Sequence, residues 1–224
     1  MQPQRMFQLK IALGVLLMLA AYSVGCGRIN LWPGWCYAGF FLITLTGSYL
    51  VLARVAPDVI VERVSWQAGV MRWDKPIVIW LMFAPVLTCL VAGLDARRNG
   101  IDTAKTNVVL GYVLAAVGAS LTLTAMARNR FYTPVVRIQK ERGHEVVDSG
   151  PYRLVRHPGN LGNIILNVAT PLMLASRWAW IPAGFSILVT VLRTKLEDRM
   201  LCKELPGYAE YVQHTQDRLF PGIW

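Results

Sequence analysis

The residues best suited to chemistry in this sequence lie on two segments separated by a long apolar stretch. The first segment, residues 150–158, reads GPYRLVRHP and contains His157, and the second carries Arg193, Glu197 and Asp198. The interval is long enough for a pair of helices that crosses a membrane and returns. Such a pair brings both segments to one membrane face. We therefore expect the imidazole and the carboxylates to share one site.

The first segment has the features of a sharp turn that leads into a helix. The Gly-Pro pair at 150–151 favours a turn, and Pro158 keeps His157 out of ordinary helical conformation. Gly162 would let the helix start close to a bound molecule, and unpaired amides at such a helix start suit carboxylate groups. The preceding residues, 137–147, could run extended and offer backbone groups to the same ligand.

Each of these residues also has a simpler interpretation. Arg153 and Arg156 could contact lipid phosphates, and His157 could be an ordinary helix-start residue. Arg193 and Glu197 are four residues apart and could form an ion pair on one helix face. An arginine costs about 2.5–3.5 kcal/mol at the centre of a span and less near the interface, so its presence there is weak evidence alone. Together, however, the residues favour a pocket.

Composition places this site in an all-α polytopic membrane protein. Of 224 residues, 54% are hydrophobic and only 16% are charged, and the mean hydropathy is +0.40. A soluble domain carries about 25% charged residues. A helix needs about 20 apolar residues to cross the hydrocarbon core. Six candidate spans follow, with five as an alternative: Ile11–Gly25, Trp35–Ala53, Pro76–Leu94, Asn107–Ala127, Leu161–Ala175 and Trp178–Leu192.

The basic residues predict how these spans are oriented. With six spans, 18 of the 23 Lys and Arg residues fall on the face that receives both termini and the connection before the last hairpin, and five fall on the other. Such a split predicts that this face is cytoplasmic. We therefore expect an integral multi-pass protein, in the cell membrane if bacterial, with a cytosolic cofactor pocket. The net charge of +10 is then a membrane-surface property, without a nucleic-acid-reading motif.

The first apolar run admits a second interpretation. Two basic residues, an apolar run to Tyr22 and a Ser-Val-Gly-Cys sequence ending at Cys26 also resemble a secretion signal with a lipid-attachment cysteine. Ser23 stands where a large aliphatic residue is usual, so a retained helix is favoured. Cys26 and Cys36 could form a disulfide on the outer face, although two unpaired cysteines are the favoured reading. Four cysteines and three histidines show no metal-ligand spacing, so we expect no metal.

We expect one integrated membrane domain with two regions. Residues 1–128 would hold the N-terminal spans, and residues 129–224 would form the catalytic region with the last hairpin and a C-terminal helix. Between the second and third spans, residues 57–74 predict an interfacial helix, with Asp58 as a cap and Ile60, Val61 and Val64 at helical spacing. It would tether two spans or form one side of a lipid entrance.

At the C-terminal two fifths, the chain resembles a known family. The stretch from His144 to Gly162 is followed by RTKLEDRML at 193–201, LPGY at 205–208, Tyr211 and RLFP at 218–221. This ordered series resembles the isoprenylcysteine carboxyl methyltransferase family, integral-membrane enzymes that use S-adenosyl-L-methionine. The N-terminal spans resemble the family only in being membrane helices.

The resemblance implies a role for particular residues. Arg193 would face the methyl acceptor, and Arg193 and Glu197 would be catalytic. The chain departs from the family pattern at Asn160, where Tyr is usual, and at Asp198, which replaces the second Glu of a Glu-Glu pair. The implied cofactor-binding residues are Arg137, His144, Glu145, Val146, Val147, Tyr152, His157, Pro158, Gly159, Asn160, Glu197 and Asp198.

The expected activity is methyl transfer from S-adenosyl-L-methionine to a lipophilic or small anionic acceptor, such as an isoprenylcysteine carboxylate. The two acids would hold the cationic part of the cofactor, and the planar fork of Arg193 would orient the acceptor. Two alternatives remain. A membrane reductase that uses NADPH on lipid double bonds needs a larger phosphate-binding cluster than this sequence shows. A transporter or scaffold needs no such site, and a transporter would show broken polar helices at mid-membrane.

Overall fold

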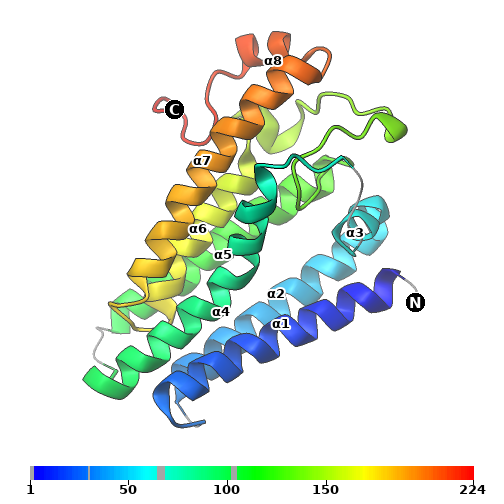
Figure 1. The fold of residues 1–224 in the computed structure, drawn as a ribbon. Coiled ribbons are helices and arrows are strands. Elements are labelled where there is room, and N and C mark those ends of the chain that lie inside the picture. The colour runs from blue at the N-terminus through cyan, green and yellow to red at the C-terminus, as the bar shows by residue number, and fades with distance from the viewer. Residues whose placement is uncertain (1–2, 30, 65–68, 102–104) are drawn as a thin grey trace.

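The computed structural model describes residues 3–29, 31–64, 69–101 and 105–224, and the regular elements of these residues are all helical. Figure 1 shows the long helices lying side by side, with α8 and the connection before α6 at one end. The α-helices are α1 (Pro3–Cys26), α2 (Trp32–Val55), α3 (Pro57–Val64), α4 (Asp74–Asn99), α5 (Lys105–Arg128), α6 (Pro158–Met173), α7 (Trp180–Glu204) and α8 (Tyr208–His214), with short 3-10 helices at Lys140–Arg142 and Gly150–Arg153.

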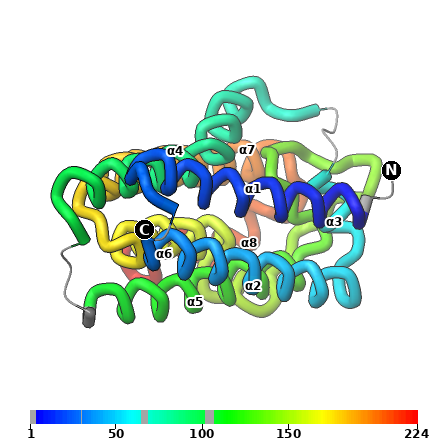
Figure 2. The backbone as a smooth tube through the Cα atoms, turned by 90° about the horizontal axis from the view of Figure 1, so that it is seen from below, coloured from blue at the N-terminus to red at the C-terminus, as the bar shows by residue number. Residues whose placement is uncertain are grey.

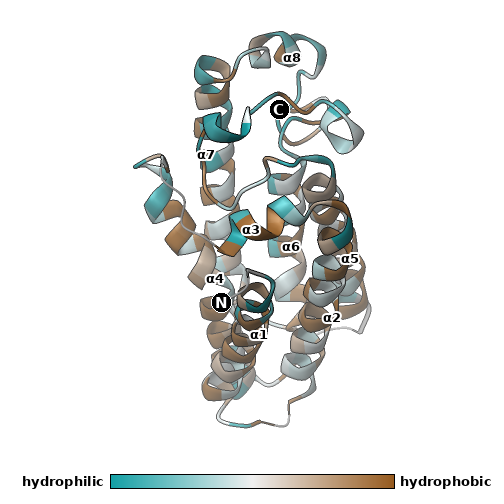
Figure 3. Ribbon diagram, turned by 90° about the vertical axis from the view of Figure 1, so that its right-hand side faces the viewer, coloured by the Kyte–Doolittle hydropathy of each residue, from teal (hydrophilic) through white to brown (hydrophobic). Residues whose placement is uncertain are grey.

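Four helices, α1, α2, α4 and α5, are long and apolar enough to cross a membrane. Their outward faces carry large apolar side chains, such as Ile43, which is 74% exposed. A soluble protein rarely exposes so much contiguous apolar surface. Figure 3 shows hydrophobic residues along these helices and hydrophilic ones around α8 and the connections near it. The all-α prediction and the multi-pass membrane character are therefore confirmed.

The last two predicted spans differ from the helices observed. The predicted segments 161–175 and 178–192 correspond to α6, of 16 residues, and to α7, of 25. The apolar part of α7 ends near Leu192, but the helix continues to Glu204, about 18 Å further at 1.5 Å per residue. The acidic residues of α7 therefore lie beyond its apolar part. Intrahelical hydrogen bonds keep this polar stretch helical.

Small residues allow α5 and α6 to pack closely. A side chain on Gly162 would collide with Thr122 and with the carbonyl of Gly118 on α5, and a side chain on Gly111 would collide with Leu172 and Met173 at the end of α6. Close helix approach through small residues is the usual mode in membranes. The expectation that Gly162 makes room for a bound molecule is therefore wrong, because the neighbouring helix fills that space.

Side chains fasten the helices at both ends. At one end, Asp95 of α4 accepts hydrogen bonds from Ser176 Oγ at 2.6 Å and from the Trp178 amide at 3.1 Å, just before α7. At the other end, Lys10 of α1 donates to the carbonyl of Val64 at 3.1 Å. Figure 2 shows α3 beside the N-terminal end of α1. The polar ends of the helices are thereby held in fixed register.

The structure has a helix within residues 57–74, where the sequence predicts one. Helix α3 occupies Pro57–Val64, and residues 65–68 lie outside the described residues. Its buried apolar residues are Val59, Ile60 and Val64, whereas Val61, predicted on the same face, is 45% exposed. Asp58 pairs with Arg142 at 3.0 Å. The four cysteines are free.

Candidate active site

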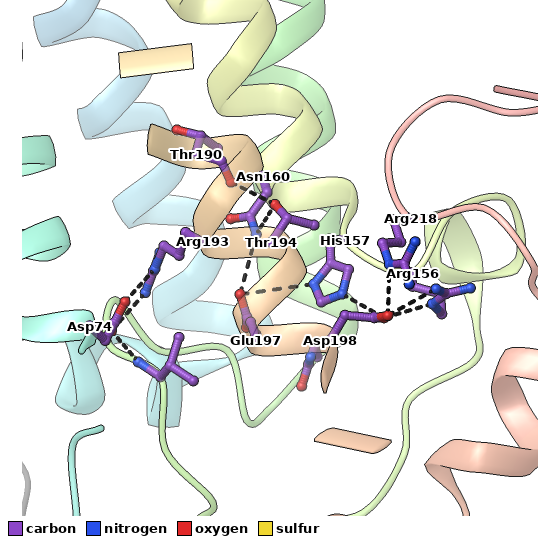
Figure 4. Close-up of polar contacts among 12 residues, drawn as sticks. Asp74, Arg156, His157, Asn160, Thr190, Arg193, Thr194, Glu197, Asp198 and Arg218 are labelled. Carbon is purple, nitrogen blue, oxygen red and sulfur yellow. Dashed lines mark hydrogen bonds and ion pairs between the residues drawn. The ribbon is translucent and has the colours of Figure 1, made fainter. Parts of the chain in front are cut away.

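The two segments singled out in the sequence meet at one end of the helix bundle. His157 immediately precedes α6, and Glu197 lies on α7 in the part beyond its apolar stretch. The His157 Nδ1 atom is 3.9 Å from a carboxylate oxygen of Glu197. Asn160, in the first turn of α6, donates through Nδ2 to Glu197 at 3.3 Å and to Thr194 Oγ1 at 3.1 Å. Figure 4 shows Glu197 between the Asn160 and His157 side chains.

These residues line a cavity that is partly open and encloses about 800 Å³ including its mouth. Its walls come from residues 129–137, from the connection at 144–147, and from α6, α7 and α8. The mixture of aromatic, aliphatic and convergent polar side chains is typical of a small-molecule site. Of the predicted site residues, those that line the cavity are Arg137, His144, Glu145, Val146, Val147, Tyr152, His157, Gly159, Asn160, Arg193 and Glu197. Pro158 and Asp198 do not.

Asp198 occupies a buried ionic cluster behind the cavity. Its carboxylate accepts from Arg156 at 2.8 and 3.0 Å, from Arg218 Nε at 2.8 Å and from the Tyr208 hydroxyl at 3.1 Å, and it lies 3.2 Å from His157 Nε2. Burial alone would raise its pKa, but these partners hold the pKa of the Asp198 carboxyl well below its usual range. Its expected direct contact with the cofactor is therefore not what the structure shows. Asp198 instead fixes His157.

Arg156 has a different role from the lipid contact considered for it. Its side chain is 2% exposed and also donates to the carbonyls of Thr215 at 2.8 Å and Gln216 at 2.6 Å. The backbone around it is held as well, since the Arg156 and His157 amides donate to the carbonyls of Asp217 and Arg218 at 2.9 and 3.0 Å. The His157 amide is thus not available to a ligand.

Arg193 is buried and engaged on one edge of its guanidinium. Its Nε donates to Asp74 Oδ1 at 2.8 Å, and its Nη2 donates to Asp74 Oδ2 at 3.3 Å and to the carbonyl of Pro134 at 2.8 Å. Asp74 is the first residue of α4. The expectation that the full fork of Arg193 grips the acceptor is therefore wrong. Within the described part of the chain, the terminal nitrogen Nη1 has no hydrogen-bond acceptor, so it could contact a ligand.

Arg137 is held by acids on both sides. Its Nη2 lies 3.0 Å from Glu62 of α3, and its Nη1 lies 2.7 Å from Glu141. These carboxylates raise its pKa despite the opposing effect of burial. The Nε–H is buried and has no hydrogen-bond partner among the residues that the structure describes. An unsatisfied buried donor on a cavity residue is costly, so it marks a place where a ligand oxygen would be stabilising.

His144 forms part of the cavity wall as a neutral ring. It stacks on Phe131 with a centroid distance of 4.6 Å, and its Nδ1 accepts the Gln139 amide at 3.3 Å. Burial, followed by the nearby charges of Arg137 and Arg142, lowers the pKa of His144 to about 4. At neutral pH this ring therefore contributes shape and polarity but no charge.

Several site residues could not be singled out from the sequence. Asp74 and Glu62 belong to the N-terminal half, where no motif marks them, and Phe131 and Tyr132 lie before the recognisable stretch. Tyr208 was noted only as part of a motif. For Asp74 the one available signal was its position, an acid directly before a long apolar run.

Together, the fold and this cavity define a multi-pass membrane protein with a polar ligand site at one end of its helices. In a comparison with known proteins, residues 109–203 match the model of the isoprenylcysteine carboxyl methyltransferase (ICMT) family. The resemblance that the sequence motifs indicated is thereby confirmed over this part of the chain.

Curated relatives agree with this match. The chain is 33% identical over 103 residues to a probable protein-S-isoprenylcysteine O-methyltransferase of Oryza sativa subsp. japonica. This aligned segment covers 46% of this chain and 48% of the relative. It is 33% identical over 111 residues to protein-S-isoprenylcysteine O-methyltransferase B of Arabidopsis thaliana, covering 47% of this chain and 55% of the relative. The chain spans about half the length of the curated relatives it matches.

Proposed function

We propose that this protein transfers a methyl group from S-adenosyl-L-methionine to a lipophilic or small anionic acceptor at the cytosolic membrane face. One observation carries the proposal. Each of the three arginines that line the cavity, Arg137, Arg156 and Arg193, makes a salt bridge with a carboxylate, whereas Glu197 makes no salt bridge with a Lys or Arg among the described residues. A part-buried carboxylate without such a partner favours a cationic ligand group.

The cavity residues fit the other parts of this cofactor. The unsatisfied Nε–H of Arg137 suits the cofactor's carboxylate, and Asn160, which already contacts Glu197, can accompany the acid in holding a cationic group. Phe131, Tyr152 and Tyr208 are buried and supply apolar and aromatic surface. One cavity therefore offers an acid for the cationic part of the cofactor and a hydrogen-bond donor for its carboxylate.

The chain's own residues can supply most of the acceleration by positioning. When bound, S-adenosyl-L-methionine supplies an electrophilic methyl group on a sulfonium. Glu197 lies where positive charge would be stabilised, and the free Nη1 of Arg193 can orient an anionic acceptor with one nitrogen. A carboxylate or thiolate is already a nucleophile, so alignment and exclusion of water suffice and no general base is needed.

Orientation and acceptor are part of the proposal. The excess of basic residues on the face that holds this site supports a cytosolic location, since 18 of 23 fall there if six helices span the membrane. The relatives' names specify an isoprenylcysteine, which supports a lipophilic carboxylate as acceptor. Asp74 and Glu62 reach the cavity arginines from the N-terminal half, which supports a single integrated domain whose catalytic region is residues 129–224.

Calorimetry on detergent-purified protein tests the proposal. We expect heat of binding with S-adenosylhomocysteine and none with NADPH. The arginines of the cavity are already neutralised by acids, so the 2′-phosphate of NADPH would meet no free cluster of positive charge. Binding of NADPH without binding of S-adenosylhomocysteine would overturn the proposal in favour of a reductase.

A further inference from the structure

Arg193 and Glu197 stand one helical turn apart on α7 and make no salt bridge with each other, although Glu197 is close enough for its charge to act on Arg193. Residues four apart on a helix are neighbours, and an arginine and a glutamate at this spacing attract each other. The Arg193 guanidinium nevertheless contacts Asp74 and Pro134, and Glu197 contacts Asn160 and lies near His157. Figure 4 shows the two side chains extending in different directions, Arg193 toward Asp74 and Glu197 toward His157.

The reason lies in how firmly Asp74 is fixed. Its carboxylate is fully buried and accepts a short hydrogen bond of 2.6 Å from the Val136 amide in addition to the two from Arg193. It also stands in the first turn of α4, where the helix dipole favours a negative charge. Arg193 is thus bound by a carboxylate that the backbone of another segment holds in place, at a site where water does not compete.

We propose that Asp74 is a positioning residue that draws Arg193 away from Glu197 and so keeps Glu197 available to the cationic part of the cofactor. This inference rests on the proposed function and extends it to a residue outside the region of family resemblance, which begins at residue 109. Asp74 touches neither the cavity nor a ligand. It acts through Arg193.

Loss of the Asp74 charge would change the partner of Arg193. An asparagine has one acceptor oxygen, whereas two Asp74 oxygens now receive three hydrogen bonds. The guanidinium would lose its compensating charge, and the carboxylate nearest along α7 is Glu197. An Arg193–Glu197 pair would then compete with the cofactor for the same acid.

A double-mutant cycle on detergent-purified full-length protein tests this, with the affinity for S-adenosylhomocysteine measured by calorimetry. We expect Asp74→Asn to weaken binding about tenfold, a loss of about 1.4 kcal/mol of binding free energy. We expect the Asp74→Asn/Arg193→Gln double variant to bind within about threefold of the unmodified protein, because no arginine remains to occupy Glu197.

A matched control lies on the same helix. Asp95 is buried like Asp74 but joins the opposite end of α4 to the start of α7. We expect Asp95→Asn to lower the melting temperature and to leave the affinity for S-adenosylhomocysteine unchanged. This comparison separates a role in cofactor binding from a general role in packing.

The outcomes distinguish this inference from the proposed function. No binding by the unmodified protein overturns both. Normal binding by Asp74→Asn overturns the positioning role alone, and so does weak binding by the double variant, since Asp74 would then act without Arg193. If Asp74→Asn does not fold, the double variant, which removes both charges together, still tests the inference, because weak binding by it would contradict a role that acts through Arg193.

Discussion

The buried carboxylate of Asp198 should contribute strongly to the stability of the folded protein. Replacing Asp198 by asparagine removes the charge that compensates two arginines. Arg156 is 2% exposed and would remain buried without its counter-charge, whereas Arg218 is 31% exposed and is partly screened by solvent. Breaking one side of a buried pair costs about 3–5 kcal/mol. At roughly 2–4 °C per kcal/mol for a chain of this size, we expect Asp198→Asn to lower the melting temperature by about 6–20 °C.

The assay is thermal unfolding in detergent at a fixed scan rate, followed by intrinsic tryptophan fluorescence. Glu204→Gln is the matched control, because Glu204 is an exposed acid on the same helix, and we expect its free energy of unfolding to change by no more than about 0.5 kcal/mol.

The pKa of Asp198 is lowered, so its contribution to stability is present above the unfolded-state pKa near 4 and is lost only as pH falls through the folded value. The deficit should therefore persist from pH 8 down to pH 5. If Asp198→Asn had the same melting temperature as the unmodified protein, the Asp198 ion pairs would not stabilise the fold as we infer.

Two further predictions concern the cavity. We expect Glu197→Gln to weaken binding of S-adenosylhomocysteine at least tenfold in calorimetry, because it removes the carboxylate without an Arg or Lys partner; unchanged affinity would remove Glu197 from the site. The pKa of His144 is lowered to about 4, below its usual 6.5, so the unfolded chain binds a proton that the folded one does not as pH falls through this range. Stability should therefore decrease from pH 6.5 toward pH 4, and His144→Gln should flatten that part of the melting profile. If His144→Gln did not alter this profile, the conclusion that the His144 ring is neutral in the folded protein would be wrong.

Features that depend on a single segment of the sequence could be predicted, whereas features that depend on contacts between segments could not. Apolar runs identify α1, α2, α4 and α5 because burial in lipid acts on each segment separately. The end of α7 could not be predicted in this way, because its last turns rely on helical hydrogen bonds and on ion pairs rather than on hydropathy. Gly162 was assigned to a ligand because sequence spacing does not show which neighbour a small residue faces.

The candidate site shows the same division. His157 and Glu197 could be placed together because one returning helix pair leaves little freedom in where its ends lie. The partners of the arginines could not be foreseen, since Glu62 and Asp74 come from far earlier in the chain and are joined to the site only by the three-dimensional packing. Asp198 was assigned to the cofactor for a related reason: its neighbour Glu197 faces the cavity, but consecutive residues on a helix point about 100° apart.

The hydrogen bonds between residues 156–157 and 217–218 have a consequence for biogenesis. A nascent chain that has emerged only as far as α8 already contains its apolar helices and can be inserted, yet the turn before α6 still lacks its backbone partners and Asp198 lacks Arg218. Completion of the binding pocket therefore depends on residues that follow every apolar helix in the chain.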